Sequence, residues 1–180
     1  MSYCVFCAER DENDMHRLYH DNHYGFPIED DNELFGRLIL EINQAGLSWS
    51  TILLKQDSFR AAYDEFNVLK IANYDQSKIE QLLSNSGIIR NRLKIQAAVY
   101  NASQLVAIQQ EFGSFKNWLD HNFPKTTDEW VKTFKKQFKF VGGEIVKEFL
   151  MSLGYLPGAH DETCIIFEKV KKLNPKWLDL

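Results

Sequence analysis

Hydrophobic residues recur along most of this chain at intervals of three and four, the spacing that places them on one face of an α-helix. Strictly alternating runs, which mark half-buried strands, are scarce. Asp30 or Asp31 can cap the most regular of these helices, and Gly46 predicts where it ends. Its stripe comprises Leu34, Phe35, Leu38, Ile39 and Ile42. The pattern predicts an all-α fold.

The same spacing predicts further helices, and only four prolines interrupt the chain. These helices are predicted around Ile52 and Leu53 after a cap at Ser48, from Asp75 or Ser77 to near Gly87, from Arg90 to Ile108, around Phe115 to Leu119, from Thr127 or Asp128 to Phe134, and after Gly142-Gly143 up to Gly154. The last segment, residues 168–180, is expected to be a surface helix or tail. Short links between the helices favour a bundle.

Length and composition bound the organisation of the chain. The 180 residues suit one domain, or two small lobes that share a core. An apolar content of 44% is enough to bury a large core and is too high for a disordered chain. We find no internal repeat and no low-complexity stretch, so we expect a single domain over residues 1–180.

Charge and cysteine content narrow the possible partners and compartment. The net charge of -4 excludes a positive field over the whole protein, so any nucleic-acid contact must come from a local basic face. The start, Met1–Arg10, has no apolar core of signal-peptide length, and no later run is long enough to span a membrane. Three cysteines, an odd number, favour a reducing cytosol over a disulfide framework. We expect a cytoplasmic protein that does not bind membranes.

Cysteine and histidine side chains near the two ends of the chain are candidate metal ligands. His160 and Cys164 are four residues apart, so one helical turn or a tight loop can aim both at one ion. Cys4 and His20 lie on a short N-terminal segment that can supply two more ligands. Thiolate and imidazole are the ligands that a structural zinc ion prefers, and a closed site needs four. The alternative is three reduced, buried cysteines and scattered histidines.

A carboxylate falls where the first long helix would otherwise bury a hydrocarbon. Glu41 follows Leu38 by three residues and Leu34 by seven, which puts it on or beside the buried stripe. A buried carboxylate needs a partner or takes up a proton. The alternatives are a buried ion pair, or a slight rotation of the helix that leaves the carboxylate in water.

Polar and aromatic side chains near Glu41 suggest what its partner is. The same third of the chain contains Gln44, Ser48, Trp49, Tyr19 and Tyr24. A pocket with one carboxylate, an amide and aromatic faces suits a flat, cationic or electron-poor heterocycle. These residues therefore favour a binding pocket.

A glycine pair between two predicted helices is a second candidate binding element. The turn Phe140–Gly143 allows positive φ and a close approach of another backbone, and amides at the start of the next helix can bind an anion. A local basic face is predicted from Lys132, Lys135, Lys136 and Lys139 together with Arg90, Arg92 and Lys94. The alternative is an ordinary joint between helices with solvated lysines.

Several short motifs, taken in order, carry a resemblance to a known family. They are Tyr19-His20-Asp21-Asn22 with Gly25 and Pro27, Leu40-Glu41 with Gln44-Ala45-Gly46-Leu47-Ser48-Trp49, Gly87-Ile88-Ile89-Arg90-Asn91-Arg92 with Lys94-Ile95, Phe138-Lys139-Phe140-Val141-Gly142, and His160 with Cys164. With these motifs the chain resembles the bacterial DNA-3-methyladenine glycosylase I family, within the helix-hairpin-helix glycosylase superfamily. The resemblance runs from Cys4 to about Cys164.

The resemblance implies a fold, a metal and a reaction. It implies a helix-hairpin-helix fold of two helical lobes sharing one cleft, with a structural zinc ion that joins the N- and C-terminal segments. The implied reaction is hydrolysis of the N-glycosidic bond of 3-methyladenine in double-stranded DNA, which leaves an abasic site. No lysine nucleophile is required, so a monofunctional hydrolase is expected. A monomer is also expected.

The resemblance also implies roles for individual residues. Glu41 is the implied catalytic residue. The implied zinc ligands are Cys4, His20, His160 and Cys164, the implied base-binding residues are Tyr19, Trp49, Tyr24, Gln44 and Phe6, and the implied DNA-binding residues are Lys139, Val141, Gly142, Gly143 and Arg90.

The chain departs from the family pattern at four positions. Phe6 and Tyr24 stand where tryptophan is common, His16 where tyrosine is common, and Ala159 where aspartate is common. These departures bear on the rim of the base pocket. They motivate an alternative function, a non-catalytic protein that binds alkylation-damaged DNA on the same scaffold. A zinc-containing helical interaction module with no role on DNA is a third hypothesis.

Overall fold

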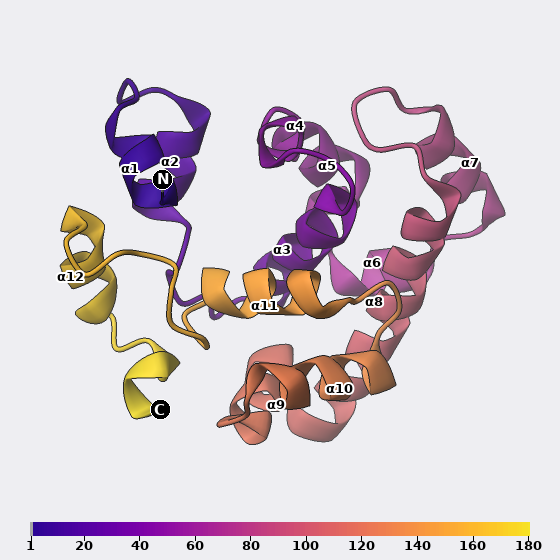
Figure 1. Ribbon diagram of the computed structural model, residues 1–180. Coiled ribbons are helices and arrows are strands. Elements are labelled where there is room, and N and C mark those ends of the chain that lie inside the picture. The colour runs from indigo at the N-terminus through magenta and orange to yellow at the C-terminus, as the bar shows by residue number, and fades with distance from the viewer. Residues whose placement is uncertain (1) are drawn as a thin grey trace. The chain divides into compact units, whose positions relative to one another are not determined.

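The computed structural model describes residues 2–180, and within that range it is helical and contains no strand (Figure 1). The all-α prediction is confirmed. None of the helices in this range combines the length and the hydrophobicity that crossing a membrane requires. The helices are α1 (Tyr3–Ala8), α2 (Met15–Asn22), α3 (Asp31–Gln44), α4 (Trp49–Leu53), α5 (Gln56–Ala62), η1 (Asp64–Phe66), α6 (Val68–Ala72), α7 (Gln76–Ser84), α8 (Arg92–Phe112), α9 (Phe115–Asn122), α10 (Thr127–Gln137), α11 (Gly143–Ser152), α12 (Ile165–Lys171) and η2 (Lys176–Asp179).

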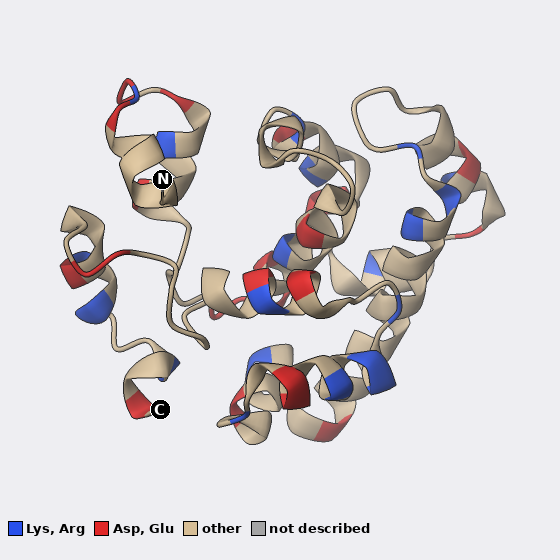
Figure 2. Cartoon of the chain, viewed as in Figure 1, with Lys and Arg blue, Asp and Glu red and all other residues tan. Residues whose placement is uncertain are grey.

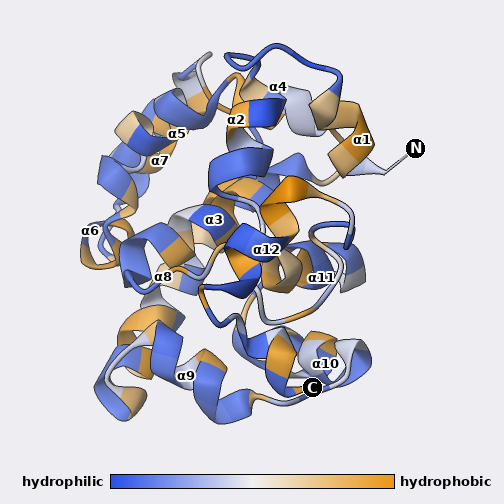
Figure 3. Ribbon diagram, turned by 90° about the vertical axis from the view of Figure 1, so that its left-hand side faces the viewer, coloured by the Kyte–Doolittle hydropathy of each residue, from blue (hydrophilic) through white to orange (hydrophobic). Residues whose placement is uncertain are grey.

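The chain divides into two compact units. The terminal unit combines the residues up to Pro27 with Lys147–Leu180, so it contains both ends of the chain. The central unit is Ile28–Val146, and one boundary between the two falls within α11. Helices α9 and α10 of the central unit each carry both hydrophobic and hydrophilic positions, as amphipathic helices do (Figure 3).

Large aromatic side chains fill the core of the central unit. Those with less than 2% of their surface exposed include Trp130, Tyr63, Phe35, Phe59, Phe115 and Phe134. Phe138 follows α10, and its ring centroid lies 5.8 Å from that of Phe115 and 5.5 Å from that of Phe134. These ring contacts fix the end of α10 and the start of the turn that follows it.

Two adjacent aspartates cap two different helices. Asp30 is the N-cap of α3, and its side chain accepts hydrogen bonds from the amides of Asn32 and Glu33. The carboxylate of Asp31 instead accepts from the amides of Phe115 and Lys116, at the start of α9. Of the two candidate caps, Asp30 is therefore the one that caps α3, while Asp31 ties the start of α3 to the start of α9.

The longest helix begins and ends later than predicted. The predicted range was Arg90 to Ile108, whereas α8 starts after Asn91, whose side chain accepts from the amide of Lys94. Gly113, with φ of 86°, ends the helix by adopting the left-handed conformation. Capping groups set both ends, and the hydrophobic stripe alone does not locate them.

The C-terminal segment from Glu168 is mostly exposed, and a few contacts hold it to its own unit. Val170 of α12 is 2% exposed, and the amide of Trp177 donates to the carbonyl of Gly154 at 3.1 Å. Gly154 has φ of 76°, and a Cβ there would lie 2.8 Å from Cβ of Pro175. Glycine at this position thus permits the close approach of the chain end.

Candidate functional site

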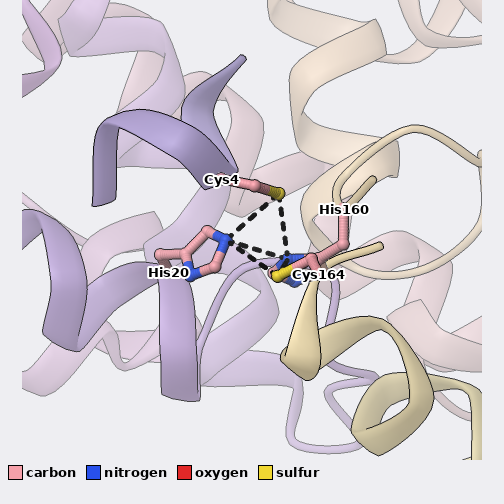
Figure 4. Close-up of side chains that lie close together, drawn as sticks. All are labelled: Cys4, His20, His160 and Cys164. Atoms are coloured by element: carbon pink, nitrogen blue, oxygen red, sulfur yellow. Dashed lines mark hydrogen bonds between the residues drawn. The ribbon is translucent and has the colours of Figure 1, made fainter. Parts of the chain in front are cut away.

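Four side chains of the terminal unit converge on one point (Figure 4). Cys4 comes from α1 and His20 from α2, while His160 and Cys164 lie on the loop before α12, with Cys164 as its N-cap residue. One candidate ligand atom from each residue lies within 4.8 Å of all the others. The sequence-predicted set is thus brought together, by a tight loop at its C-terminal half.

The distances within this cluster fit a metal ion. Nε2 of His20 lies 3.3 Å from Sγ of Cys4, 3.8 Å from Sγ of Cys164 and 3.1 Å from Nδ1 of His160. Metal–nitrogen bonds of about 2.0 Å and metal–sulfur bonds of about 2.3 Å in tetrahedral geometry put ligand atoms roughly 3.3–3.8 Å apart. The cluster can therefore hold a metal ion with little movement of the side chains.

Both imidazole rings are oriented by groups outside the cluster. Nδ1 of His20 lies 2.6 Å from Oδ1 of Asp21, and Nε2 of His160 donates to the carbonyl of Tyr24 at 2.7 Å. These contacts leave Nε2 of His20 and Nδ1 of His160 facing the centre of the cluster. Outer contacts of this kind fix the tautomer of histidines that bind metals.

Backbone groups bring the loop of His160 close to the other ligands. Gly25 has φ of 81°, and a Cβ there would lie 2.9 Å from Cβ of Ala159 and 3.2 Å from the ring of His160. The amide of Asp161 donates to Sγ of Cys4 at 3.3 Å. Any larger residue at position 25 would push this loop away, so glycine is part of the cluster's geometry.

Burial favours the neutral forms of two members of the cluster, Cys4 and His160. Desolvation raises the pKa of the Cys4 thiol to about 12 and lowers the pKa of His160. A metal ion that binds the sulfur of Cys4 therefore displaces its proton. Cys7 is also buried, and its thiol donates to the carbonyl of His16, but it does not belong to the cluster.

In the central unit, Glu41 lies on the buried face of α3. It is 5% exposed, and its neighbours Leu38 and Ile42 are at most 1% exposed. The expected position on or beside the hydrophobic stripe is confirmed, and the orientation that would leave the carboxylate in water is excluded. Its predicted catalytic role stays a prediction.

A tight turn joins α3, which carries Glu41, to α4, which begins with Trp49. Ala45 has φ of -52° and ψ of 116°, and Gly46 has φ of 82°, which is the type II pattern with glycine at its third position. The amide of Leu47 donates to the carbonyl of Gln44 at 2.7 Å. The side-chain amide of Gln44 donates back to the carbonyl of Leu47 at 3.1 Å, so this predicted base-binding group helps to close the turn.

Helix α4 begins directly after this turn and carries Trp49 in its first position. Ser48 is the N-cap, and its hydroxyl accepts from the amide of Thr51 at 3.3 Å. The cap was expected at Ser48 and is confirmed. Trp49 therefore starts a helix whose position depends on the turn before it.

Lys94 is buried rather than part of a basic face, contrary to expectation. It is 5% exposed, and its ammonium donates to the carbonyls of Asn43 at 3.0 Å and Ala45 at 2.7 Å. Desolvation lowers its pKa. The signal for burial was present in the sequence, because Lys94 precedes the buried Ala98 by four residues and Asn101 by seven.

The predicted aromatic residues of the terminal unit lie on or next to its first two helices. The rings of Tyr19 and Tyr24 are 5.7 Å apart, and the hydroxyl of Tyr24 donates to Oε2 of Glu148 at 3.1 Å. The guanidinium of Arg10 lies 3.9 Å from the ring centroid of Phe6, which covers one face of that ring. Base binding by these three aromatic residues stays a prediction.

The turn before α11 is held by an asparagine of α8. The side chain of Asn101 is fully buried, accepts from the amide of Lys139 at 2.8 Å and donates to its carbonyl at 3.0 Å. We expected a glycine of this turn to adopt a positive φ, but Phe140 does so instead, with φ of 62°. A Cβ on Gly142 or Gly143 would meet nothing within 4 Å, so the space beside both is open.

Basic residues lie on the last turn of α10 and in the loop before α11, next to this turn, and further basic residues lie near the start of α8 (Figure 2). Arg90 and Lys139 are exposed, and the ammonium of Lys139 lies 4.0 Å from the ring centroid of Tyr100. Val141 is buried at 5% exposure, so only its backbone can face an external ligand.

Comparison with known proteins decides the family. The model of the methyladenine glycosylase family matches residues 9–137 of this chain. The chain belongs to this family. Among curated methyladenine glycosylases it is similar to DNA-3-methyladenine glycosylase 1 of Escherichia coli, with 34% identity over 82% of this chain and 89% of that protein. It is also 32% identical to DNA-3-methyladenine glycosylase of Haemophilus influenzae, over 82% of this chain and 90% of that protein.

Solved structures of methyladenine glycosylases have a similar fold. The chain is 35% identical to a crystal structure of 3-methyladenine DNA glycosylase I, with a TM-score of 0.77 over 88% of this chain and 97% of that one. It is 30% identical to a variant of 3-methyladenine DNA glycosylase I in complex with 3-methyladenine, with a TM-score of 0.81 over 92% of this chain and 97% of that one. A structure of 3-methyladenine DNA glycosylase I from Staphylococcus aureus is 30% identical to this chain, with a TM-score of 0.79 over 89% of this chain and 95% of that one.

Proposed function

We propose that this protein is a DNA-3-methyladenine glycosylase, which hydrolyses the N-glycosidic bond of 3-methyladenine in alkylated double-stranded DNA and leaves an abasic site. The observation that carries the proposal is Glu41, a buried carboxylate on a helix joined to Trp49 by one tight turn. Family membership and the similarity to glycosylases of two bacteria support the same conclusion.

The chemistry of alkylated bases explains why a carboxylate and an indole serve this purpose. Methylation puts positive charge on the purine, so the damaged base is already a good leaving group. The enzyme must mainly take the nucleotide out of the stack and recognise the cationic ring. Trp49 stacks on the base, and Glu41 attracts its positive charge in a site of low dielectric. Neutral adenine gains little from either contact.

Hydrolysis by water, without a covalent lysine intermediate, fits the lysines of this chain. Lys94 is the buried lysine among residues 2–180, and its ammonium already donates to two backbone carbonyls. A nucleophilic amine must be free to attack the sugar carbon. We therefore propose a monofunctional hydrolase that does not cleave the DNA strand.

We propose that α10, the turn before α11 and α11 itself form the helix-hairpin-helix element that binds DNA. The backbone from Val141 to Gly143 has open space beside both glycines, so phosphate oxygens can approach its amides. Lys139 and Arg90 are exposed and add positive charge.

Neutralising the basic residues should weaken DNA binding evenly across sequences. Replacing Lys139 or Arg90 with alanine is expected to lower affinity for undamaged duplex. Each change should reduce the slope of log affinity against log salt concentration by about one. Fluorescence anisotropy at several salt concentrations measures the slope. An unchanged slope in both variants would remove these residues from the DNA interface. Lys125→Ala, a change in the loop before α10, serves as the control.

We further propose that the metal is zinc and that its role is structural. Two cysteines and two histidines make a closed, four-coordinate donor set, which zinc prefers and which leaves no position for catalysis. The ion ties α1 and α2 to the loop before α12 within the terminal unit. Thiolate ligands must stay reduced, so a reducing compartment such as the cytoplasm suits this site.

Release of free base from alkylated DNA tests the proposed function. Duplex DNA treated with a methylating agent is incubated with the protein, and released 3-methyladenine is separated by chromatography. We expect 3-methyladenine and abasic sites in equal amounts, without strand cleavage. Tight binding to the damaged duplex with no released base would instead favour the non-catalytic binding protein. Light scattering during size-exclusion chromatography measures the molar mass in solution and so tests whether the protein is a monomer, as expected.

A further inference from the structure

The burial of Lys94 calls for an explanation. A charged amine in the protein interior loses its hydration, and this loss is large unless strong partners replace the water. Methionine has a similar length and would fill the space without that cost. Lysine must therefore provide an interaction at this position that an apolar side chain cannot.

The interaction lies at the C-terminal end of α3. Carbonyls in the last turn of a helix have no partner within the helix, and they carry the negative end of its dipole. The ammonium of Lys94 donates to two such carbonyls, of Asn43 at 3.0 Å and of Ala45 at 2.7 Å. A cation suits this end of a helix, and a lysine from α8 can reach it because Lys94 lies in the first turn of α8.

The carbonyl of Ala45 belongs to the type II turn that precedes Trp49. Two hydrogen bonds between Gln44 and Leu47 close this turn on its other side. Gly46 at its tip is exposed and touches no other part of the protein within 4 Å of a Cβ position. Lys94 therefore connects α8 to this turn by a hydrogen bond.

We propose that Lys94 is a positioning residue for base recognition. By fixing the turn from Gln44 to Leu47, it sets where Trp49 lies relative to Glu41. This inference rests on the proposed glycosylase function. If Lys94 had only a structural role, its replacement would change the stability of the protein but not the reaction rate of the folded enzyme.

Replacing Lys94 with methionine tests this inference. We expect the single-turnover rate of 3-methyladenine release by the folded variant to fall by about 100-fold, because displacement of a binding group by about 1 Å costs that much. Affinity for undamaged duplex, which depends on the turn before α11, should stay within about twofold. Lys94→Arg keeps the charge and the donors, and should recover part of the rate.

Two further variants separate positioning from stability. Ile95→Ala removes a fully buried side chain from the same turn of α8 and destabilises the protein, but it leaves the ammonium of Lys94 and its two acceptor carbonyls unchanged. At a temperature where it is folded, it should keep its rate within about threefold. Gly46→Ala strains the turn alone, because alanine disfavours φ of 82°, and should lower the rate by about tenfold.

Hydrogen exchange of the Leu47 amide reports on the turn without any substrate. This amide bonds to the carbonyl of Gln44, and we expect its exchange to accelerate at least about tenfold in Lys94→Met. Unchanged exchange would overturn the inference, as would a Lys94→Met rate equal to that of the wild type or of Ile95→Ala. If the wild-type protein released no base, the proposed function would fall, while the exchange data would still decide whether Lys94 holds the turn.

Discussion

Replacing Glu41 with glutamine is expected to lower the rate of 3-methyladenine release by about 100-fold, or about 2.7 kcal/mol of transition-state stabilisation. The amide has nearly the shape of the carboxylate but no charge. Its attraction to the cationic purine is lost in a site where charges are poorly screened, because Glu41 is 5% exposed. Single-turnover kinetics on methylated duplex measure the effect.

The same substitution elsewhere on α3 provides the control. Glu33 pairs with Arg60 at 2.6 Å, and its side chain is 45% exposed, so Glu33→Gln removes only a partly solvated ion pair. Such a change should alter stability by about 0–1 kcal/mol and leave the rate unchanged. If Glu41→Gln released base as fast as the wild type, the proposed role of this carboxylate would be wrong. If both variants lost rate equally, the loss would come from a general disturbance of α3 and not from the Glu41 carboxylate.

The longer helices of the central unit could be predicted because the information is local, whereas α5 and α6 were not predicted. The stripe from Leu34 to Ile42, the cap at Asp30 and the glycine after the helix all lie within one short segment. Helices α1 and α2, of six and eight residues, were not predicted. They form because the terminal unit packs them, and tertiary contacts of this kind leave little trace in local sequence.

The metal cluster shows the same division between local and distant information. The spacing of His160 and Cys164 predicts that these two can share an ion. That Cys4 and His20 complete the set depends on contacts between residues more than 140 positions apart, as between His20 and Cys164. The motifs shared with a family supplied that link, and spacing alone left it open.

Two local patterns misled because a distant residue decides the outcome. Lys94 was grouped with Arg90 and Arg92 as surface charge, yet carbonyls of α3 hold its ammonium in the interior. A glycine was expected to supply the left-handed residue before α11, yet Phe140 adopts it after Asn101 fixes the backbone of Lys139. Satisfied polar groups far along the chain override the local preference in both places.

Removing the metal is expected to lower the melting temperature by about 5–10 °C. An ion bound only by the folded protein, at about 100 times its dissociation constant, stabilises it by about 2.7 kcal/mol. In a chain of this size each kcal/mol moves the melting temperature by about 2–4 °C. Calorimetry with and without a chelator measures the shift, and mass spectrometry should find one zinc ion per chain in the untreated protein.

Replacing each of the two cysteines of α1 in turn shows which of them binds the metal. Cys4→Ser should lose the zinc ion and melt at the temperature of the chelated protein. Cys7→Ser should keep the ion, because the thiol of Cys7 donates to the carbonyl of His16 and a hydroxyl can do the same. If both variants lost the metal, or if chelation left the melting temperature unchanged, the four-ligand site would be refuted. The difference between two cysteines three positions apart therefore separates coordination from burial, since both are buried to similar degrees.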